Sequence, residues 1–135
     1  MPITNTIDTL NGIILEVWTG EVSATDLAAY WKQLLTDPEA LAIRRTLVDL
    51  RDAHILFSGE ELYDLIRTVV EPMLNGTLWH TALLVADAHQ FGVSRQYQSY
   101  ATVYSSDAIF YDKDAALKWL LQFCPKSPAA SRFEV

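Results

Sequence analysis

The hydrophobic positions of this 135-residue chain change their spacing along the sequence, and these changes predict where strands and helices lie. Residues 3–10 and 13–18 are rich in β-forming side chains, and Asn11-Gly12 between them favours a two-residue type I′ turn. This pattern predicts an opening hairpin. Short apolar runs without alternation at 46–50 and 81–86 predict strands covered on both faces, and 108–111 predicts a further short strand.

Four other segments place apolar residues at the three- and four-residue spacing of amphipathic helices. The first two begin at capping boxes, Ser23-Ala24-Thr25-Asp26 and Ser58-Gly59-Glu60-Glu61, and end near Asp37-Pro38 and near residues 72–76. The third carries a stripe from Val93 to Tyr104. The fourth begins at Asp112-Lys113-Asp114 and ends at Pro125.

The expected order is therefore ββαβαβαβα, which predicts an α/β fold with a mixed, mainly parallel sheet flanked by four helices. The opening hairpin adds one antiparallel edge strand to this sheet. We expect one domain over residues 1–125, followed by a frayed tail at 126–135 that is rich in Ser, Pro and Ala.

Composition excludes several classes of function. Asp and Glu outnumber Lys and Arg by 17 to 10, and the basic residues form no patch, which argues against a nucleic-acid partner. The first basic residue is Lys32, and no apolar run approaches membrane-spanning length, so a cytoplasmic protein without membrane insertion is expected. The single Cys124 excludes an internal disulfide, and the absence of glycine-rich loops predicts no nucleotide cofactor.

Three segments resemble a known family: Thr46–Ala53 (TLVDLRDA), Gln90–Tyr97 (QFGVSRQY) and Asp112–Leu120 (DKDAALKWL). They are similar to stretches of the SpoIIAA-like family of the STAS superfamily (sulfate transporter and anti-sigma-factor antagonist), and the likeness covers residues 5–122. The resemblance implies a mixed sheet flanked by helices and a protein-binding role without catalysis.

The same resemblance directs attention to Ser58. Anti-sigma-factor antagonists are switched by phosphorylation of a serine at the start of the helix after the central strand, and Phe57-Ser58-Gly59 is the corresponding place here. This sequence departs from the Asp-Ser-Ser-Gly pattern of those proteins. Ser58 is therefore either a phosphoacceptor at a helix N-terminus or a helix cap completed by Glu61.

A second candidate site is the rim where the parallel strands end, because open α/β sheets bind ligands beyond the carboxyl ends of their strands. The residues expected to gather there are Arg51, Asp52, His54, Asp87, His89, Gln90 and Arg95. Arg95 would hold an anion with help from the helix dipole, or form an ion pair with Asp87 or Asp52. Asp87 and His89, with His54 or His80, lack the spacing of a metal site, so no metal is predicted.

The leading hypothesis is a non-enzymatic protein-binding or regulatory module that binds a protein partner or forms a homodimer. The alternative is a protein that binds a small apolar or anionic ligand, and an enzyme ranks last because no catalytic constellation is visible. Tyr97, Tyr100 and Tyr104 are interpreted as core or as a partner surface. Trp18 and Trp79 lie at predicted strand edges, which leaves open whether their rings are exposed.

Overall fold

The computed structural model describes residues 2–74 and 78–123. In chain order, the elements are β1 (Ile3–Asp8), β2 (Ile13–Val22), α1 (Ala24–Leu34), α2 (Pro38–Ile43), β3 (Arg45–Ile55), α3 (Gly59–Leu65), η1 (Ile66–Val70), α4 (Glu71–Met73), β4 (Trp79–Leu84), α5 (Ala88–Tyr100), β5 (Ser105–Phe110) and α6 (Lys113–Leu121). The element η1 is a π-helix that joins α3 and α4 into one continuous helical path. The tail predicted at 126–135, with Cys124 and Pro125, lies outside the described residues.

The five strands form one sheet in the order β1-β2-β3-β4-β5. β1 runs antiparallel to β2, and the other three pairs are parallel. This confirms the predicted mixed sheet with one antiparallel edge. The register of β2 against β3 shifts between Val17 and Thr19, where two residues of β3, Leu50 and Arg51, face Trp18 alone. This bulge lets β3 continue past the end of β4, whose last residue, Leu84, pairs with Asp49.

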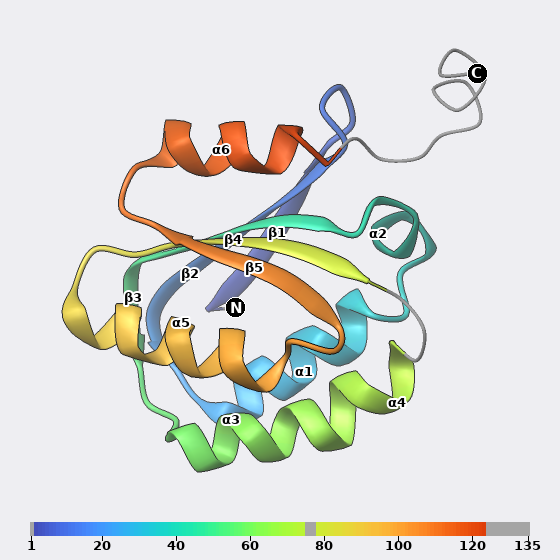
Figure 1. The fold of residues 1–135 in the computed structure, drawn as a ribbon. Coiled ribbons are helices and arrows are strands. Elements are labelled where there is room, and N and C mark those ends of the chain that lie inside the picture. The colour runs from blue at the N-terminus through green and yellow to red at the C-terminus, as the bar shows by residue number, and fades with distance from the viewer. Residues whose placement is uncertain (1, 75–77, 124–135) are drawn as a thin grey trace.

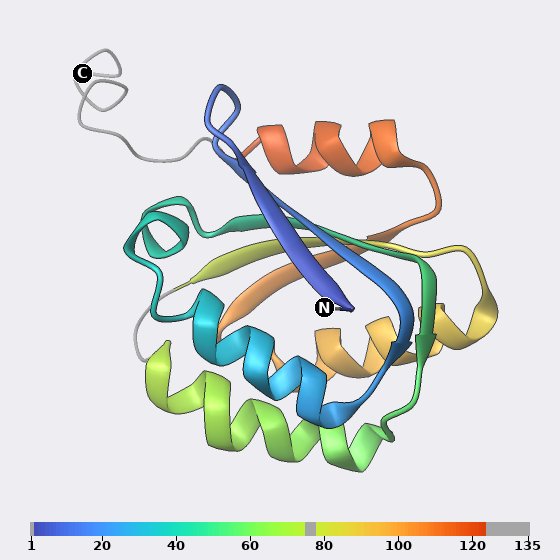
Figure 2. The same cartoon turned by 180° about the vertical axis from the view of Figure 1, so that it is seen from behind.

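The helices form two layers of unequal size. Each connection from β2 to β5 steps to the next strand in the same direction, and right-handed crossovers then place all the connecting helices on one face. Figure 1 shows α1, α3 and α5 together below the sheet and α6 alone above it, and Figure 2 shows the same arrangement from behind. The carboxyl ends of β3, β4 and β5 meet at one edge of the sheet.

Two apolar cores follow from these layers. The larger core joins the sheet to α1, α3, η1 and α5, and includes Leu27, Val48, Leu62 and Leu83. The smaller core packs α6 through Ala116 and Leu120 against the other face. Strands β2 to β5 each contribute side chains to both cores, because successive side chains along a strand point to opposite faces of the sheet. The sequence interpretation of buried central strands is confirmed.

The structure corrects two local expectations. The hairpin has four residues between Asp8 and Ile13 in place of a two-residue type I′ turn, and only Gly12 has positive φ, at 64°. The Asp8 carboxylate accepts hydrogen bonds from the backbone and side chain of Asn11 and so holds the wider loop. The sequence interpretation also missed α2. Asp37-Pro38, taken only as the end of a helix, begins another, because proline suits the first helical position.

The side chains of Trp18 and Trp79, whose exposure the sequence left open, are both buried in the larger core. Their indole nitrogens have partners there: Trp18 Nε1 donates to Glu16 Oε2 at 2.7 Å, and Trp79 Nε1 donates to Thr46 Oγ1 at 2.8 Å. The helices that pack on this face of the sheet cover both strand positions. Both rings therefore line the interior.

Candidate functional site

A surface groove lies between the start of α3 and the first half of α5. It is lined by Phe57, Ser58, Gly59, Ala88, His89, Gly92, Val93 and Gln96. Two residues predicted for different sites, Ser58 and His89, therefore meet in one place. Gly59, Gly92 and Gln96 were missed, because nothing in the local pattern shows that α3 and α5 lie side by side.

Gly59 permits the close contact between the two helices. A Cβ atom at this position would lie 2.5 Å from Gln96 Nε2, so the Gln96 side chain would have to move. A methyl group at residue 59 would therefore change the floor of the groove.

Ser58 is a complete helix cap. Its Oγ accepts a hydrogen bond from the Glu61 backbone N–H at 3.1 Å, and its own N–H donates to Glu61 Oε1 at 2.9 Å. Both halves of the predicted capping box are thus present. The hydroxyl group is also exposed at the edge of the groove. The phosphoacceptor role stays a prediction beside the cap.

Replacing Ser58 with alanine is expected to lower the free energy of unfolding by about 1 kcal/mol, because the Glu61 N–H loses its acceptor. Ser58→Asp is the matched control, since aspartate caps helices as well as serine does. Urea denaturation followed by tryptophan fluorescence measures both variants. An Ala variant as stable as the wild type, or an Asp variant equally weakened, would show that the cap contributes nothing.

The predicted rim residues on β3 lie on the part of the strand that extends past β4. Arg51 forms an ion pair with Asp49, with Nη2 to Oδ2 at 2.9 Å, and this pairing lowers the pKa of Asp49 against the opposing effect of burial. Asp52 and His54 are exposed on the same extension, where β3 pairs with β2. None of the three predicted residues lines the groove.

The residues at the start of α5 mostly support the structure. Asp87 caps the helix, accepting from the Gln90 N–H at 2.8 Å. The buried Gln90 side chain accepts from Ala86 N and donates to the carbonyls of Arg51 and Ala53, which ties α5 to the end of β3. Gln90 thus has its hydrogen-bonding capacity in use within the fold.

Arg95 stands apart from the other predicted residues. It lies about two turns into α5, where its Nη1 donates to Gln98 Oε1 at 3.1 Å. Within the described part of the chain it forms no ion pair with Asp87 or Asp52. Arg95 does not line the groove beside His89, so an anion held by Arg95 stays a prediction that the groove does not support.

The described residues also hold no cluster of three His, Cys, Asp or Glu side chains placed to ligate a metal ion. No helix in residues 2–74 and 78–123 is both long and apolar enough to cross a membrane.

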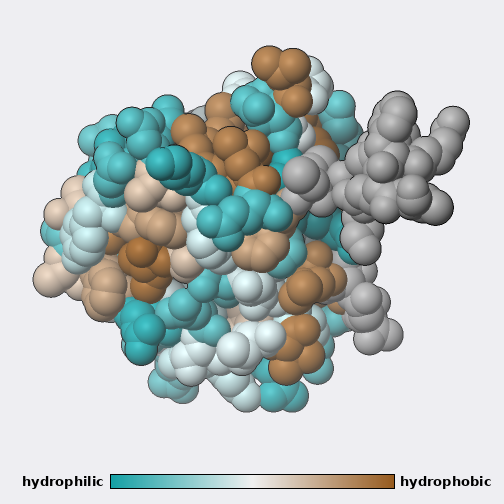
Figure 3. All heavy atoms as spheres, turned by 45° about the horizontal axis from the view of Figure 1, so that its top comes forward, coloured by the Kyte–Doolittle hydropathy of each residue, from teal (hydrophilic) through white to brown (hydrophobic). Residues whose placement is uncertain are grey.

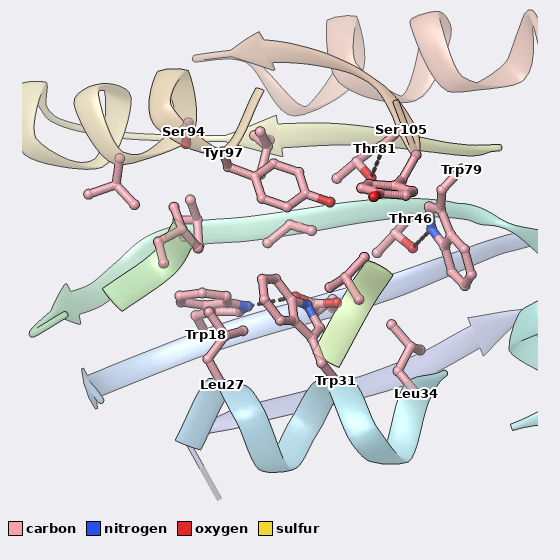
Figure 4. Close-up of a pocket in the computed structure, with 18 of the residues that line it drawn as sticks. Trp18, Leu27, Trp31, Leu34, Thr46, Trp79, Thr81, Ser94, Tyr97 and Ser105 are labelled. Carbon is pink, nitrogen blue, oxygen red and sulfur yellow. Dashed lines mark hydrogen bonds between the residues drawn. The ribbon is translucent and has the colours of Figure 1, made fainter. Parts of the chain in front are cut away.

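A second hollow lies inside the larger core, between the sheet and the helices α1, α3, η1 and α5. It encloses about 70 Å³ and is mainly apolar. Figure 4 shows Ser94 and Tyr97 reaching it from α5 on one side, and Leu27, Trp31 and Leu34 from α1 on the other. The sequence interpretation did not identify this cavity, although it placed Tyr97 on a stripe that was either core or interface.

Glu16 is the carboxyl group of the cavity wall. Burial raises its pKa to about 7, while hydrogen bonds from Trp18 and Tyr30 act in the opposite direction. Tyr30 Oη in turn accepts from Asn5 Nδ2 at 2.9 Å. The buried carboxyl group thus titrates near neutrality and is held in place by two aromatic side chains.

A second buried carboxyl group lies close to the wall. Ser105, which lines the cavity, donates from its hydroxyl to Asp107 Oδ1, and burial raises the pKa of Asp107 to about 7. Asp107 Oδ2 has no hydrogen-bond partner among the described residues. Burial first, and then the charge of Asp107, raise the pKa of Tyr97. Two carboxyl groups at the cavity, those of Glu16 and Asp107, therefore have pKa values raised by burial.

Comparisons with known proteins identify the fold of this chain through solved structures. No protein-family model matches the chain, and no curated protein sequence matches it significantly. A solved structure from Shewanella loihica, an uncharacterized protein with a SpoIIAA-like fold, superposes with a TM-score of 0.57 at 19% identity, covering 87% of this chain and 91% of that one. The chain has a SpoIIAA-like fold. An anti-sigma factor antagonist from Mycobacterium paratuberculosis superposes with a TM-score of 0.53 at 16% identity, covering 87% of this chain and 93% of that one.

The SpoIIAA-like fold confirms the resemblance drawn from the three segments, and it explains their positions. Thr46–Ala53 lies in the central strand β3, Gln90–Tyr97 lies in α5, and Asp112–Leu120 leads into α6. Ser58 begins the helix that follows the central strand, as the resemblance implied. The segments that looked familiar are thus mainly those that build the sheet and its two helix layers.

Proposed function

We propose that this chain is a non-enzymatic, cytoplasmic regulatory module that binds a protein partner through the groove between α3 and α5. The observation that carries the proposal is exposed apolar surface beside the groove. Leu56, two residues before Ser58, is 50% exposed, and Tyr63 on α3 is 40% exposed. Tyr63 also packs edge-on against Tyr100 of α5, with 5.2 Å between ring centroids. The two rings thus join α3 to α5 outside the residues that line the groove.

Charge indicates the kind of partner. The exposed side of α3 carries Glu60, Glu61 and Asp64, and the chain as a whole has a net charge of −7. A complementary surface has apolar side chains surrounded by basic residues, because complementary charge steers association and fixes orientation. Two copies of this chain meeting at α3 would bring like charges together. A different protein therefore fits this surface better than a homodimer does.

The fold neighbours support the proposal. One superposed structure is an anti-sigma factor antagonist, and Ser58 holds the place at the start of α3 that the family resemblance links to a regulatory phosphate. A phosphate on Ser58 would add charge at the edge of the groove and weaken an interaction with an acidic surface, or strengthen one with a basic surface.

The remaining apolar surface is dispersed. Figure 3 shows the face over α6, where apolar residues form separate patches between hydrophilic ones. Leu10, which is 92% exposed, lies in the hairpin turn, far from α3 in both ribbon views. It provides a matched control for the groove.

The test uses Leu56→Asp, with Leu10→Asp as its control. A partner captured by the wild type, once purified, should bind Leu10→Asp normally and Leu56→Asp at least tenfold more weakly, as expected when a central apolar contact is lost. Isothermal titration calorimetry measures both affinities. A partner that binds both variants equally does not use this groove. Sedimentation showing a dimer that Leu56→Asp dissociates would replace the proposal with self-association.

A further inference from the structure

One polar group in the wall of the interior cavity, the hydroxyl group of Ser94, is not explained by packing alone. Ser94 on α5 lines it and is only 1% exposed, yet its Oγ has no hydrogen-bond partner among the described residues. A buried hydroxyl group without a partner destabilises a folded protein, and most buried polar groups are satisfied. Alanine would fill this helical position without that cost. The Ser94 hydroxyl group therefore indicates a hydrogen-bond partner that comes from outside the chain.

We propose that this cavity binds a small, uncharged and mainly apolar molecule with one oxygen atom that hydrogen-bonds to Ser94 Oγ. The cavity shares Phe57 and Val93 with the α3–α5 groove, but Ser94 lines only the cavity, and a ligand there goes beyond the proposed protein-binding function. The remaining wall is largely aromatic and aliphatic. It includes three tryptophans, Trp18, Trp31 and Trp79.

The charge of the wall selects against other ligand classes. Among the described residues, no Lys, Arg or His side chain lines the cavity and Glu16 does, so an anion would enter an unpaired and repulsive environment. A small cation would need several acceptors. Glu16 Oε2 already accepts from Trp18, and Tyr30 hydrogen-bonds to the same carboxyl group. A neutral molecule loses the least hydration and needs only the contact with Ser94.

The volume sets the size of the ligand. The cavity of about 70 Å³ is roughly half of an engineered apolar cavity of about 150 Å³ that binds benzene. It therefore suits a molecule with about half of benzene's non-hydrogen atoms and one hydroxyl or carbonyl group, such as a two-carbon alcohol, and a long acyl chain would not fit within it.

The backbone around the cavity is irregular at two places. Val70, which ends the π-helix η1, lines one wall, and π-helical turns are frequent at functional sites. Leu50 and Trp18, at the bulge between β2 and β3, line another, and bulges are also common next to sites. Both irregularities shape the wall of the same cavity. They support a cavity kept for a ligand.

Ethanol is the probe for this site, measured on the full chain by ¹H–¹⁵N NMR titration and by tryptophan fluorescence. The wild type should show saturable shifts centred on the residues of the wall. Ser94→Ala should weaken ethanol binding at least threefold while leaving the binding of xenon, which forms no hydrogen bond, unchanged. Ser99→Ala, an exposed position of the same helix, is the matched control and should behave as the wild type does.

A stability measurement separates binding from misfolding. Ligand-free Ser94→Ala should have a higher urea midpoint than the wild type, because it removes a buried hydroxyl group without a partner. Weaker alcohol binding in a more stable protein is the expected signature. The proposal is overturned if ethanol causes no saturable shift, if Ser94→Ala binds it as tightly as the wild type, or if acetate or ethylamine binds more tightly than ethanol.

Discussion

Replacing Arg45 with methionine is expected to lower the free energy of unfolding by about 4 kcal/mol, the largest effect of any single substitution proposed for this chain. Arg45 is the first residue of β3 and is only 2% exposed. Its guanidinium group donates from Nε to Gly12 O at 3.1 Å and from Nη1 to Leu120 O at 2.9 Å and Phe123 O at 2.7 Å. Nη2 donates to Asn11 O.

This one side chain therefore joins three segments that are distant in sequence. It satisfies carbonyl groups of the β1–β2 turn and carbonyl groups at the end of α6, where helix carbonyls lack partners within the helix. Methionine fills similar space but leaves these acceptors buried and unpaired. The loss should loosen the hairpin turn and the last turn of α6 together.

Urea denaturation of Arg45→Met and Arg45→Lys measures the effect, and Arg67→Met is the control. Lysine keeps the charge but cannot reach the four carbonyls at once, so most of the loss should remain. Arg67 forms an exposed ion pair with Glu71, and solvent screens such pairs, so its removal should leave the free energy of unfolding nearly unchanged. A stability of Arg45→Met close to that of Arg67→Met would contradict the assigned role.

The second large effect is a dependence of stability on pH that arises from Glu16. Its pKa is about 7 in the folded chain against 4.5 for an unperturbed glutamate, because the buried carboxyl group disfavours its charged form. Below the unfolded value both states carry the proton and Glu16 contributes nothing. As pH rises towards 7 the unfolded state ionises first, so the folded state loses about 3 kcal/mol of stability.

Glu16→Gln removes this titration, so the fall in unfolding free energy between pH 5 and pH 8 should be about 3 kcal/mol smaller than in the wild type. Asp107 contributes a fall of the same sign, because burial also raises its pKa to about 7. Burial lowers the pKa of His80, which acts in the opposite direction. Both groups are unchanged in Glu16→Gln, so the difference between the two proteins isolates Glu16.

Urea titrations at the two pH values, followed by tryptophan fluorescence, provide the measurement. Glu21→Gln on the exposed end of the same strand is the control and should keep the wild-type pH dependence. If Glu16→Gln also keeps the full dependence, Glu16 ionises in the folded chain at its ordinary pKa.

Much of the secondary structure could be predicted because local chemistry decides it. Ser23 and Ser58 begin α1 and α3 in the form that their capping boxes indicate, since a capping box needs only residues three positions apart. The two wrong predictions also concern local structure, but in each case the same residues are compatible with two different local structures. Asp37-Pro38 suits both the end of one helix and the beginning of the next. Asn11-Gly12 favours a tight turn until Asp8 stabilises a wider one.

The candidate site was predicted less well. Ser58 and His89 were both chosen from the sequence, and the structure brings them together in one groove. Gln90 and Asp87 were chosen for their chemistry, but they serve α5 and its contact with β3. The sequence indicates which polar side chains lie near a strand end. It does not indicate whether these side chains already form hydrogen bonds with backbone groups of the fold.

The sequence by itself thus determined the alternation of strands and helices, the mixed sheet with its antiparallel edge, and the caps that begin the helices. These features depend on neighbouring residues and on hydrophobic periodicity. Only the tertiary structure decided that Arg45 and Glu16 are buried, that Ser94 lines a cavity without a partner, and that α3 and α5 form a groove. Burial and hydrogen bonding across long sequence distances depend on how whole elements pack, and no local pattern encodes that packing.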